Sequence, residues 1–143
     1  MVRPLLHFTD RRNLKSILQR GLLSWEKLER RGIQHFAAST HLSRELDSRA
    51  GLGDYVRLCR SDRHPMAYKA QCEGRVDQLV WLKIDPCVVR WRSTRFSDRN
   101  ATSSSATIGD DAGLFLVSPD LQAEVMIEGA LSTRWILNLD EIS

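Results

Sequence analysis

Two polar residues near the carboxyl end of the chain, Gln122 and Glu124, have a spacing that can place both side chains in one pocket. Residues two apart on a β-strand share a face, so a strand here would aim both side chains the same way. Ala123, Val125 and Ile127 would then point into a core. A carboxylate at the rim of such a strand, together with a distant arginine for phosphate groups, suits an enzyme that splits a dinucleotide such as NAD.

Arginine dominates the basic residues, and the charge is uneven along the chain. Of the 21 basic residues 17 are arginine; residues 1–63 carry 13 basic and 7 acidic residues, and residues 64–143 carry 8 and 11. The guanidinium fork matches phosphate oxygens, so the first half suits a phosphate-rich partner. A coding bias toward arginine without functional meaning explains the same pattern equally well.

The bulk composition predicts one globular domain over residues 1–143. Hydrophobic residues make up 42% and charged residues 27%, an ordinary balance. No apolar run approaches the roughly 20 residues that span a bilayer, and the first six residues are too short and too quickly polar for a secretion signal. We therefore expect a cytoplasmic protein with no membrane partner. The three cysteines lack metal-binding spacing, so we expect no metal site.

Local patterns predict helices early in the chain and strands late. A first strand at 5–8 leads into a helix that Thr9 or Asp10 caps and Gly21 ends. Further helices are expected at 25–31, 43–49 and 65–74, and further strands at 55–58, 77–84, 114–117, 124–127 and 135–139. The small polar residues 101–113 predict a mobile loop. This order favours an α+β fold with an antiparallel or mixed sheet.

Several short motifs follow one another in the order found in a known family. They are His7–Leu14 with Gly21-Leu22, Arg49-Ala50-Gly51, Asp54-Tyr55-Val56, Pro65-Met66, Phe96–Ala101 and Gln122-Ala123-Glu124. Together they resemble the DarT family of ADP-ribosyltransferases, toxins that attach ADP-ribose from NAD to bases of single-stranded DNA. The resemblance implies an ADP-ribosyltransferase-like fold with a central split β-sheet and N-terminal helices. It also implies NAD as substrate and no metal.

Glu124 and Arg49 are the catalytic residues that this resemblance implies. A carboxylate on a ribose hydroxyl stabilises the oxocarbenium charge that builds when the nicotinamide–ribose bond breaks. Without the resemblance, Glu124 is better explained as a solvated strand carboxylate. Arg49 would bind the NAD pyrophosphate and help position the reacting base. The alternative interpretation of Arg49 is a surface arginine at a helix end, and Arg44 is a second candidate for the pyrophosphate-binding role.

The resemblance also implies a set of cofactor contacts. The set is His7, Thr9, Asn13, Gly21, Arg49, Tyr55 and Met66. The main chain at His7 and the hydroxyl of Thr9 would hold the nicotinamide, and Asn13 lies one helical turn beyond Thr9. Ordinary structural roles remain open for each: a histidine that caps a strand end, an asparagine that caps a helix, and core residues at Tyr55 and Met66.

The family pattern changes where the acceptor would bind. Arg57, Leu58, Cys59 and Arg60 stand where the family's "DYVPFYF" motif continues after "DYV", and Asn100 replaces a histidine of its "FTDxHA" motif. Lost aromatic residues remove stacking surface, whereas the two arginines add charge for phosphate. We expect substrate contacts from Arg57, Arg60, Asn100 and Gln122. The segment between Asn100 and Gln122 is shorter than in the family.

Three functions follow from these observations. The first is transfer of ADP-ribose to a base in single-stranded DNA, by the toxin of a toxin–antitoxin or phage-defence system whose antitoxin is, for example, an ADP-ribose-removing macrodomain. The second is transfer to RNA or protein, or plain NAD hydrolysis. The third is a basic nucleic-acid-binding module without catalysis, for which Glu124 would be dispensable and binding would fall steeply with salt.

Overall fold

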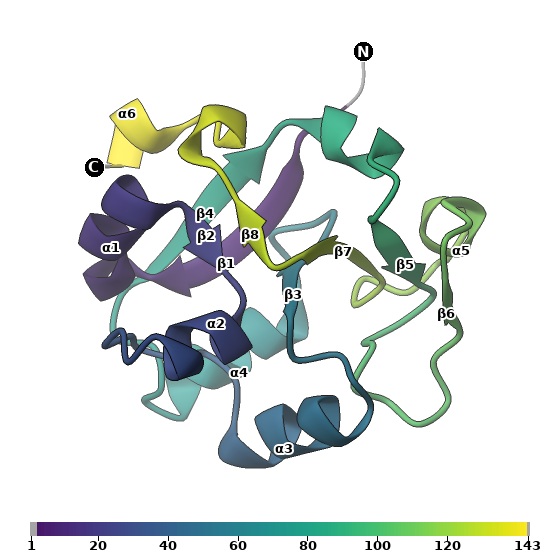
Figure 1. Cartoon of the computed structure of the whole chain (residues 1–143), viewed down its shortest axis with the longest axis horizontal. Helices are drawn as coiled ribbons and strands as arrows, with labels where there is room; N and C mark the ends of the chain where they lie inside the picture. The colour runs from purple at the N-terminus through teal and green to yellow at the C-terminus, as the bar shows by residue number, and fades with distance from the viewer. Residues whose placement is uncertain (1–2, 143) are drawn as a thin grey trace.

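A pair of long antiparallel strands runs through the computed structural model, which describes residues 3–142. Strand β1 (Leu5–Asp10) pairs with β4 (Leu79–Ile84), from Leu5 opposite Ile84 to Asp10 opposite Leu79 (Figure 1). Strand β1 is predicted correctly at its start, and it continues two residues further than expected. The pair forms one half of the core.

A second sheet has the strand order β3-β7-β5-β6, and all its pairings are antiparallel. Its strands are β3 (Tyr55–Leu58), β5 (Arg95–Ser97), β6 (Ile108–Gly109) and β7 (Glu124–Glu128). Two short strands, β2 (Leu22–Leu23) and β8 (Ala130–Leu131), form a third pair. A bridge between Leu6 and Cys59 places β1 beside β3. The α+β fold with a split antiparallel sheet is therefore confirmed.

Helices cover the edges of these sheets (Figure 1). They are the 3₁₀ turn η1 (Arg11–Asn13), α1 (Leu14–Arg20), α2 (Trp25–Arg30), α3 (His41–Arg49), α4 (Pro65–Cys72), the 3₁₀ turn η2 (Pro86–Arg90), α5 (Gly113–Leu116), the 3₁₀ turn η3 (Thr133–Trp135) and α6 (Leu139–Ile142). Asp10 caps η1 by accepting from the Arg12 N–H, as the sequence predicts. Arg11 donates to the carbonyl of Ile142, which holds the last helix beside the first.

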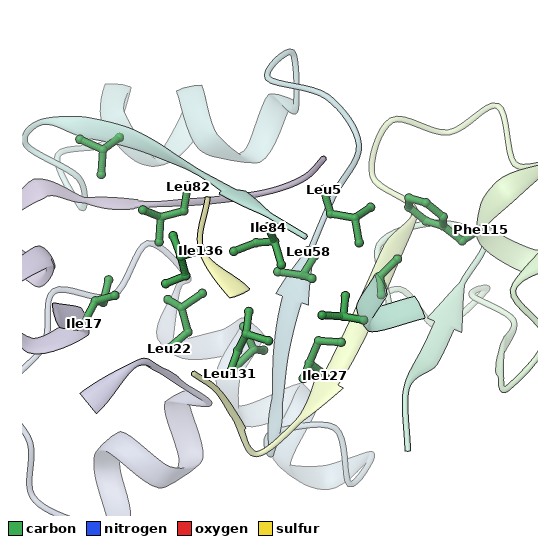
Figure 2. Packing of buried hydrophobic residues seen from close by; sticks show 14 of the residues in the cluster. Leu5, Ile17, Leu22, Leu58, Leu82, Ile84, Phe115, Ile127, Leu131 and Ile136 are labelled. Carbon is green, nitrogen blue, oxygen red and sulfur yellow. The ribbon is translucent and has the colours of Figure 1, made fainter. Parts of the chain in front are cut away.

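The core lies between the two larger sheets (Figure 2). Leu82 and Ile84 of β4 face Leu58 of β3 and Ile127 of β7, and all four are at most 2% exposed. Both faces of β7 are buried, since Met126 is as fully enclosed as Val125. The simple alternation expected for this strand is therefore wrong, because other parts of the fold cover both faces of β7.

Two predicted strands are wrong. Residues 114–116 belong to α5 and Val117 follows its end; the Asp111 carboxylate accepts from the Gly113 N–H and the Asp111 carbonyl accepts from the Leu114 N–H to start the helical turn. Residues 135–139 hold only the end of η3, a single bridge from Ile136 to Ile84, and the start of α6. Short apolar runs carry too little periodicity to separate a strand from a helical turn.

Smaller boundaries also differ from those expected. Helix α3 begins at His41, because the Thr40 hydroxyl accepts from the Ser43 N–H. The expected loop at 101–113 contains the short strand β6. No helix within the described residues is long and apolar enough to cross a membrane.

Candidate active site

A cavity of about 250 Å³ opens where β1, β3 and β7 meet the segment at 35–39 and helices α1, α2 and α3. Of the predicted site residues, those that line the cavity are His7, Thr9, Asn13, Gly21, Tyr55, Arg57, Met66, Asn100 and Glu124. They come from stretches that are far apart in the sequence. The fold therefore gathers most of the predicted site into one place.

Glu124 opens strand β7 and is only 7% exposed. Its backbone N–H donates to the Ser97 hydroxyl across 3.1 Å. Its Oε1 accepts from Arg57 Nη1 at 3.1 Å and from the Ala101 N–H at 2.8 Å. Within residues 3–142, Oε2 has no hydrogen-bond donor. One oxygen of the carboxylate is thus held firmly, and the other remains available to a ligand in the cavity.

Burial sets the ionisation of this carboxylate. It raises the pKa of Glu124 above its usual value, while Arg57 and the Ala101 N–H oppose the rise. Burial alone would lower the pKa of Arg57, but Glu124 and Asp47 raise it, so the guanidinium stays charged. A charged guanidinium against a buried carboxylate gives the site a strong local field.

Asp47 is the partner of Arg57 that sequence reasoning missed. Its Oδ1 lies 3.0 Å from Arg57 Nη2 and also accepts from the Thr102 hydroxyl at 2.9 Å. The carboxylate is 9% exposed, although it lies on the short helix α3. No local pattern marks Asp47 as buried, because its arginine partner lies on a different element.

Two neutral histidines line the cavity. Burial lowers the pKa of His7, and its Nδ1 donates to the Arg57 carbonyl at 2.8 Å. In the neutral ring, Nε2 is then the hydrogen-bond acceptor. Burial also lowers the pKa of His64, whose Nδ1 accepts from the Met66 N–H at the start of α4. The sequence predicts no role for His64. A histidine directly before a proline that opens a helix is the signal that could have identified this cap.

Asn13 is positioned by a set of bonds that was not expected. Its Nδ2 donates to Thr9 Oγ1 at 3.0 Å and to the Phe36 carbonyl at 2.9 Å, and its Oδ1 accepts from the Phe36 N–H at 2.8 Å. Asn13 therefore fastens the cavity wall at 35–39 to β1. The Arg12 guanidinium adds a contact to the same segment, since its central carbon lies 3.9 Å from the centre of the Phe36 ring.

Three predicted site residues lie outside the cavity lining. Arg49 is on the surface of α3, with its side chain 72% exposed and paired to Glu45. Arg60 donates to the carbonyls of Phe115 and Asp120, so it ties β3 to α5. Gln122 lies in the turn before β7 rather than on the strand, so it does not share a strand face with Glu124 as expected.

The described residues offer little for a metal. Within residues 3–142 no group of three or more histidine, cysteine or acidic residues could hold a metal ion. Cys59 lines the cavity, but burial raises the pKa of its thiol to about 12, so the sulfur is protonated. The cavity therefore offers two carboxylates, a guanidinium, three imidazoles and hydroxyl groups.

A comparison with known protein families identifies the family to which this chain belongs. The model of the family "ssDNA thymidine ADP-ribosyltransferase, DarT" matches residues 6–140. No curated protein matches the sequence. Among solved structures, the fold is similar to Thermosipho africanus DarTG in complex with ADP-ribose, with a TM-score of 0.78, 20% identity and 94% of this chain covered.

Two structures from Thermus sp. 2.9 are also similar. DarT in complex with ADP-ribosylated ssDNA has a TM-score of 0.73 and 20% identity, and DarT in complex with NAD⁺ has a TM-score of 0.63 and 21% identity. Each match covers 94% of this chain. The chain spans 43% of the Thermosipho chain and 78% and 79% of the two Thermus chains. The ADP-ribosyltransferase-like fold is therefore confirmed.

Proposed function

Because the chain belongs to the DarT family of single-stranded-DNA thymidine ADP-ribosyltransferases, we propose that it cleaves NAD and transfers ADP-ribose to a thymidine base in single-stranded DNA. The observation that carries the proposal is the setting of Glu124. This carboxylate is buried at the cavity, one oxygen is fixed by two donors, and the other is free within the described residues.

The reaction needs a group that stabilises positive charge on the ribose. When the bond from ribose C1′ to nicotinamide breaks, nicotinamide leaves with the bonding electrons and the sugar gains oxocarbenium character. Glu124 Oε2 would accept a hydrogen bond from a ribose hydroxyl and stabilise that charge. A base nitrogen then attacks C1′ and loses its proton. The products are nicotinamide, a proton and the ADP-ribosylated base.

The other cavity residues would bind and orient NAD. His7 and Thr9 lie on β1 at the wall of the cavity, where the resemblance expects the nicotinamide. Tyr55, Met66 and Gly21 would contribute apolar surface and close backbone approach. Asn13 would act by holding the wall at 35–39 rather than by contacting NAD, because all its bonds go to protein groups. NAD is thus the substrate that this arrangement fits.

A single-stranded acceptor suits an active site that lies in a cavity. A base that is already unstacked enters without the cost of about a few kcal/mol for leaving a duplex. Asn100 lines the cavity next to Ala101, and its Oδ1 accepts from the Thr102 N–H; within residues 3–142 its amide N–H₂ has no acceptor, so it is available to donate to a base. Arg60 and Gln122, expected to contact the acceptor, lie outside the cavity lining, and their roles remain predictions.

Membership of the DarT family also supports proposals for the biological role and location of the protein. We propose one ADP-ribosyltransferase-like domain over residues 1–143, acting as a toxin with an ADP-ribose-removing antitoxin. The cytoplasm is the proposed location, because the reaction consumes NAD and needs single-stranded DNA in the same compartment. Transfer to RNA or protein, and NAD hydrolysis, are tested alongside transfer to DNA.

The test supplies NAD labelled in its adenylate phosphate and follows the label and the released nicotinamide. The acceptors are a single-stranded oligonucleotide with thymidine, the same oligonucleotide without thymidine, its duplex, RNA and a protein lysate. We expect label only on the first. Glu124→Gln should slow transfer by about 10²- to 10³-fold, while Glu128→Gln, at the exposed end of the same strand, should leave it unchanged.

Other outcomes identify the alternatives. Label on RNA or protein would reassign the acceptor, and nicotinamide release without transfer would indicate an NAD hydrolase. Complete absence of nicotinamide release from folded protein, with DNA binding that falls with salt and does not depend on Glu124, would replace the enzyme with a binding module.

A further inference from the structure

We propose that Arg57 and Asp47 are positioning residues for this reaction: Asp47 orients Arg57, and Arg57 holds Glu124 so that one carboxylate oxygen faces the ribose. The inference rests on the proposed function and adds two residues to it. The sequence predicts a substrate contact for Arg57 and no role for Asp47.

The geometry is that of a chain of three side chains from three elements. Asp47 on α3 binds Arg57 Nη2 at 3.0 Å, and Arg57 on β3 binds Glu124 on β7 through Nη1 at 3.1 Å. The planar guanidinium fixes the angle between its two nitrogens, so the position of Asp47 determines where Nη1 lies. The Ala101 N–H adds a second donor to the same Glu124 oxygen. The carboxylate cannot rotate without breaking both bonds.

Arg57 is placed to act through Glu124 rather than on phosphate. Both of its terminal nitrogens are engaged by carboxylates, and its side chain is only 20% exposed. Among the cavity-lining residues of the described chain, Arg57 is the sole arginine or lysine. Arg49, which the family resemblance assigns to catalysis, is 72% exposed and pairs with Glu45. The structure thus places one guanidinium against the reacting carboxylate.

The charges around Glu124 also indicate that Arg57 acts through this carboxylate. The charged groups, histidines and cysteine that line the cavity together with Glu124 are Asp47 on α3, Arg57 on β3, Cys59 just after β3, His7 on β1, His35 in the segment at 35–39 and His64 before α4. Burial keeps His7 and His64 neutral near pH 7 and the Cys59 thiol protonated. Arg57 is therefore the permanent cation that opposes protonation of Glu124. Without it, burial and the charge of Asp47 would both favour a protonated carboxyl group.

The experiment measures nicotinamide release against pH for four proteins: wild type, Arg57→Met, Arg57→Lys and Asp47→Asn. Arg57→Met should lower kcat by about 10- to 100-fold, as loss of an orienting partner does at other sites. KM for NAD should change by less than about threefold, because the ground-state binding of NAD is largely retained. The acid limb of the pH profile should move to higher pH. Arg57→Lys should restore part of kcat, and Asp47→Asn should fall between the two.

A matched control separates positioning from stability. Arg12→Met removes an arginine that pairs with a buried carboxylate, Asp10, outside the cavity lining. It should lower the free energy of unfolding without moving the acid limb. Where Arg57→Met fails to fold, Arg57→Lys and Asp47→Asn provide the same comparison of kcat, KM and pH profile.

The outcomes distinguish this inference from the proposed function. Active wild type together with folded Arg57→Met that keeps its kcat and acid limb would overturn the positioning role alone. A parallel change of KM and kcat with an unmoved pH profile would do the same, because it would indicate a purely structural effect. Wild type that releases no nicotinamide would overturn the proposed function and the positioning role with it.

Discussion

The Thr102 hydroxyl donates a 2.9 Å hydrogen bond to Asp47 Oδ1 and joins the segment after β5 to helix α3. The preceding residue, Ala101, donates its N–H to Glu124. Two consecutive residues of one segment therefore hold the two carboxylates that also bind Arg57. The expected loop at 101–113 thus begins with residues that are part of the site wall.

Thr102→Val should lower the free energy of unfolding by about 0.5 to 1.5 kcal/mol, because one intramolecular hydrogen bond is lost from a half-buried position. The Asp47 carboxylate keeps Arg57 as a partner, so the loss should stay in this range. Urea denaturation measures it. Thr107→Val is the control, since Thr107 is exposed in the same segment. Equal effects at the two positions would contradict the proposed tie between segment and helix.

The raised pKa of Glu124 predicts a stability that falls as pH rises. The folded protein binds this proton more tightly than the unfolded chain, so the favourable contribution is present at low pH. It is lost as pH rises from the ordinary value of 4.5 through the raised folded-state pKa. Denaturation of wild type and Glu124→Gln between pH 4 and pH 8 (roughly the window that linkage implies) should show a decline in wild type that the variant lacks.

Activity should follow the opposite direction. The ionised carboxylate accepts the ribose hydroxyl, so nicotinamide release should fall as pH drops through the raised pKa of Glu124. Glu124→Gln should lower kcat by about 10²- to 10³-fold, the range seen when one stabilising group is removed from a transition state. A profile that stays flat through acidic pH, in active enzyme, would contradict an ionised Glu124.

Asp10 should show the reverse pH dependence of stability. Bonds from Arg12, opposed by burial and helped by the Asp77 N–H, lower the pKa of Asp10 from 3.8 to about 2. Its contribution is therefore present above pH 3.8 and is lost as pH falls toward 2. Asp10→Asn should cost about 2 to 4 kcal/mol of unfolding free energy, because a buried charge network is broken. Asp110→Asn, on the exposed surface, is the control in thermal unfolding.

Gly21→Ala should destabilise the fold more than the same change at Gly32. Both glycines have positive φ, +77° and +64°, which costs an alanine about 1 to 2 kcal/mol at either site. Only at Gly21 would the new Cβ lie 2.5 Å from a backbone oxygen, that of Leu131, whereas Gly32 has open space. Chemical denaturation should therefore separate the two variants by at least about 1 kcal/mol. Similar losses would show that the contact with β8 can relax.

Some of the site was predictable because it lies in short motifs. His7 and Thr9 are two apart on one strand, and Glu124 belongs to a three-residue motif, so a local resemblance identifies them without the fold. Gly21 follows a helix whose end the sequence marks by itself. Such residues need only their neighbours to be recognised.

The expected roles of the arginines show the limit of this reasoning. Arg49 and Arg57 have the same side chain and lie eight positions apart, yet one is exposed on α3 and the other faces Glu124. The choice depends on the pairing of β3 with β7, which places Tyr55 opposite Glu128 and Leu58 opposite Val125. A shift of this register by one residue would turn Arg57 to the other face.

The sequence by itself determined the capped and glycine-ended helices, the apolar strands of the core and the order of motifs that indicates the family. These features depend on backbone conformation and side-chain types within a few residues of one another. Only the tertiary structure decided that Asp47, Arg57 and Glu124 form one chain of contacts and that Asn13 holds Phe36. Those contacts join elements far apart in the sequence, and burial gives the charged groups their strength only after the sheets have packed.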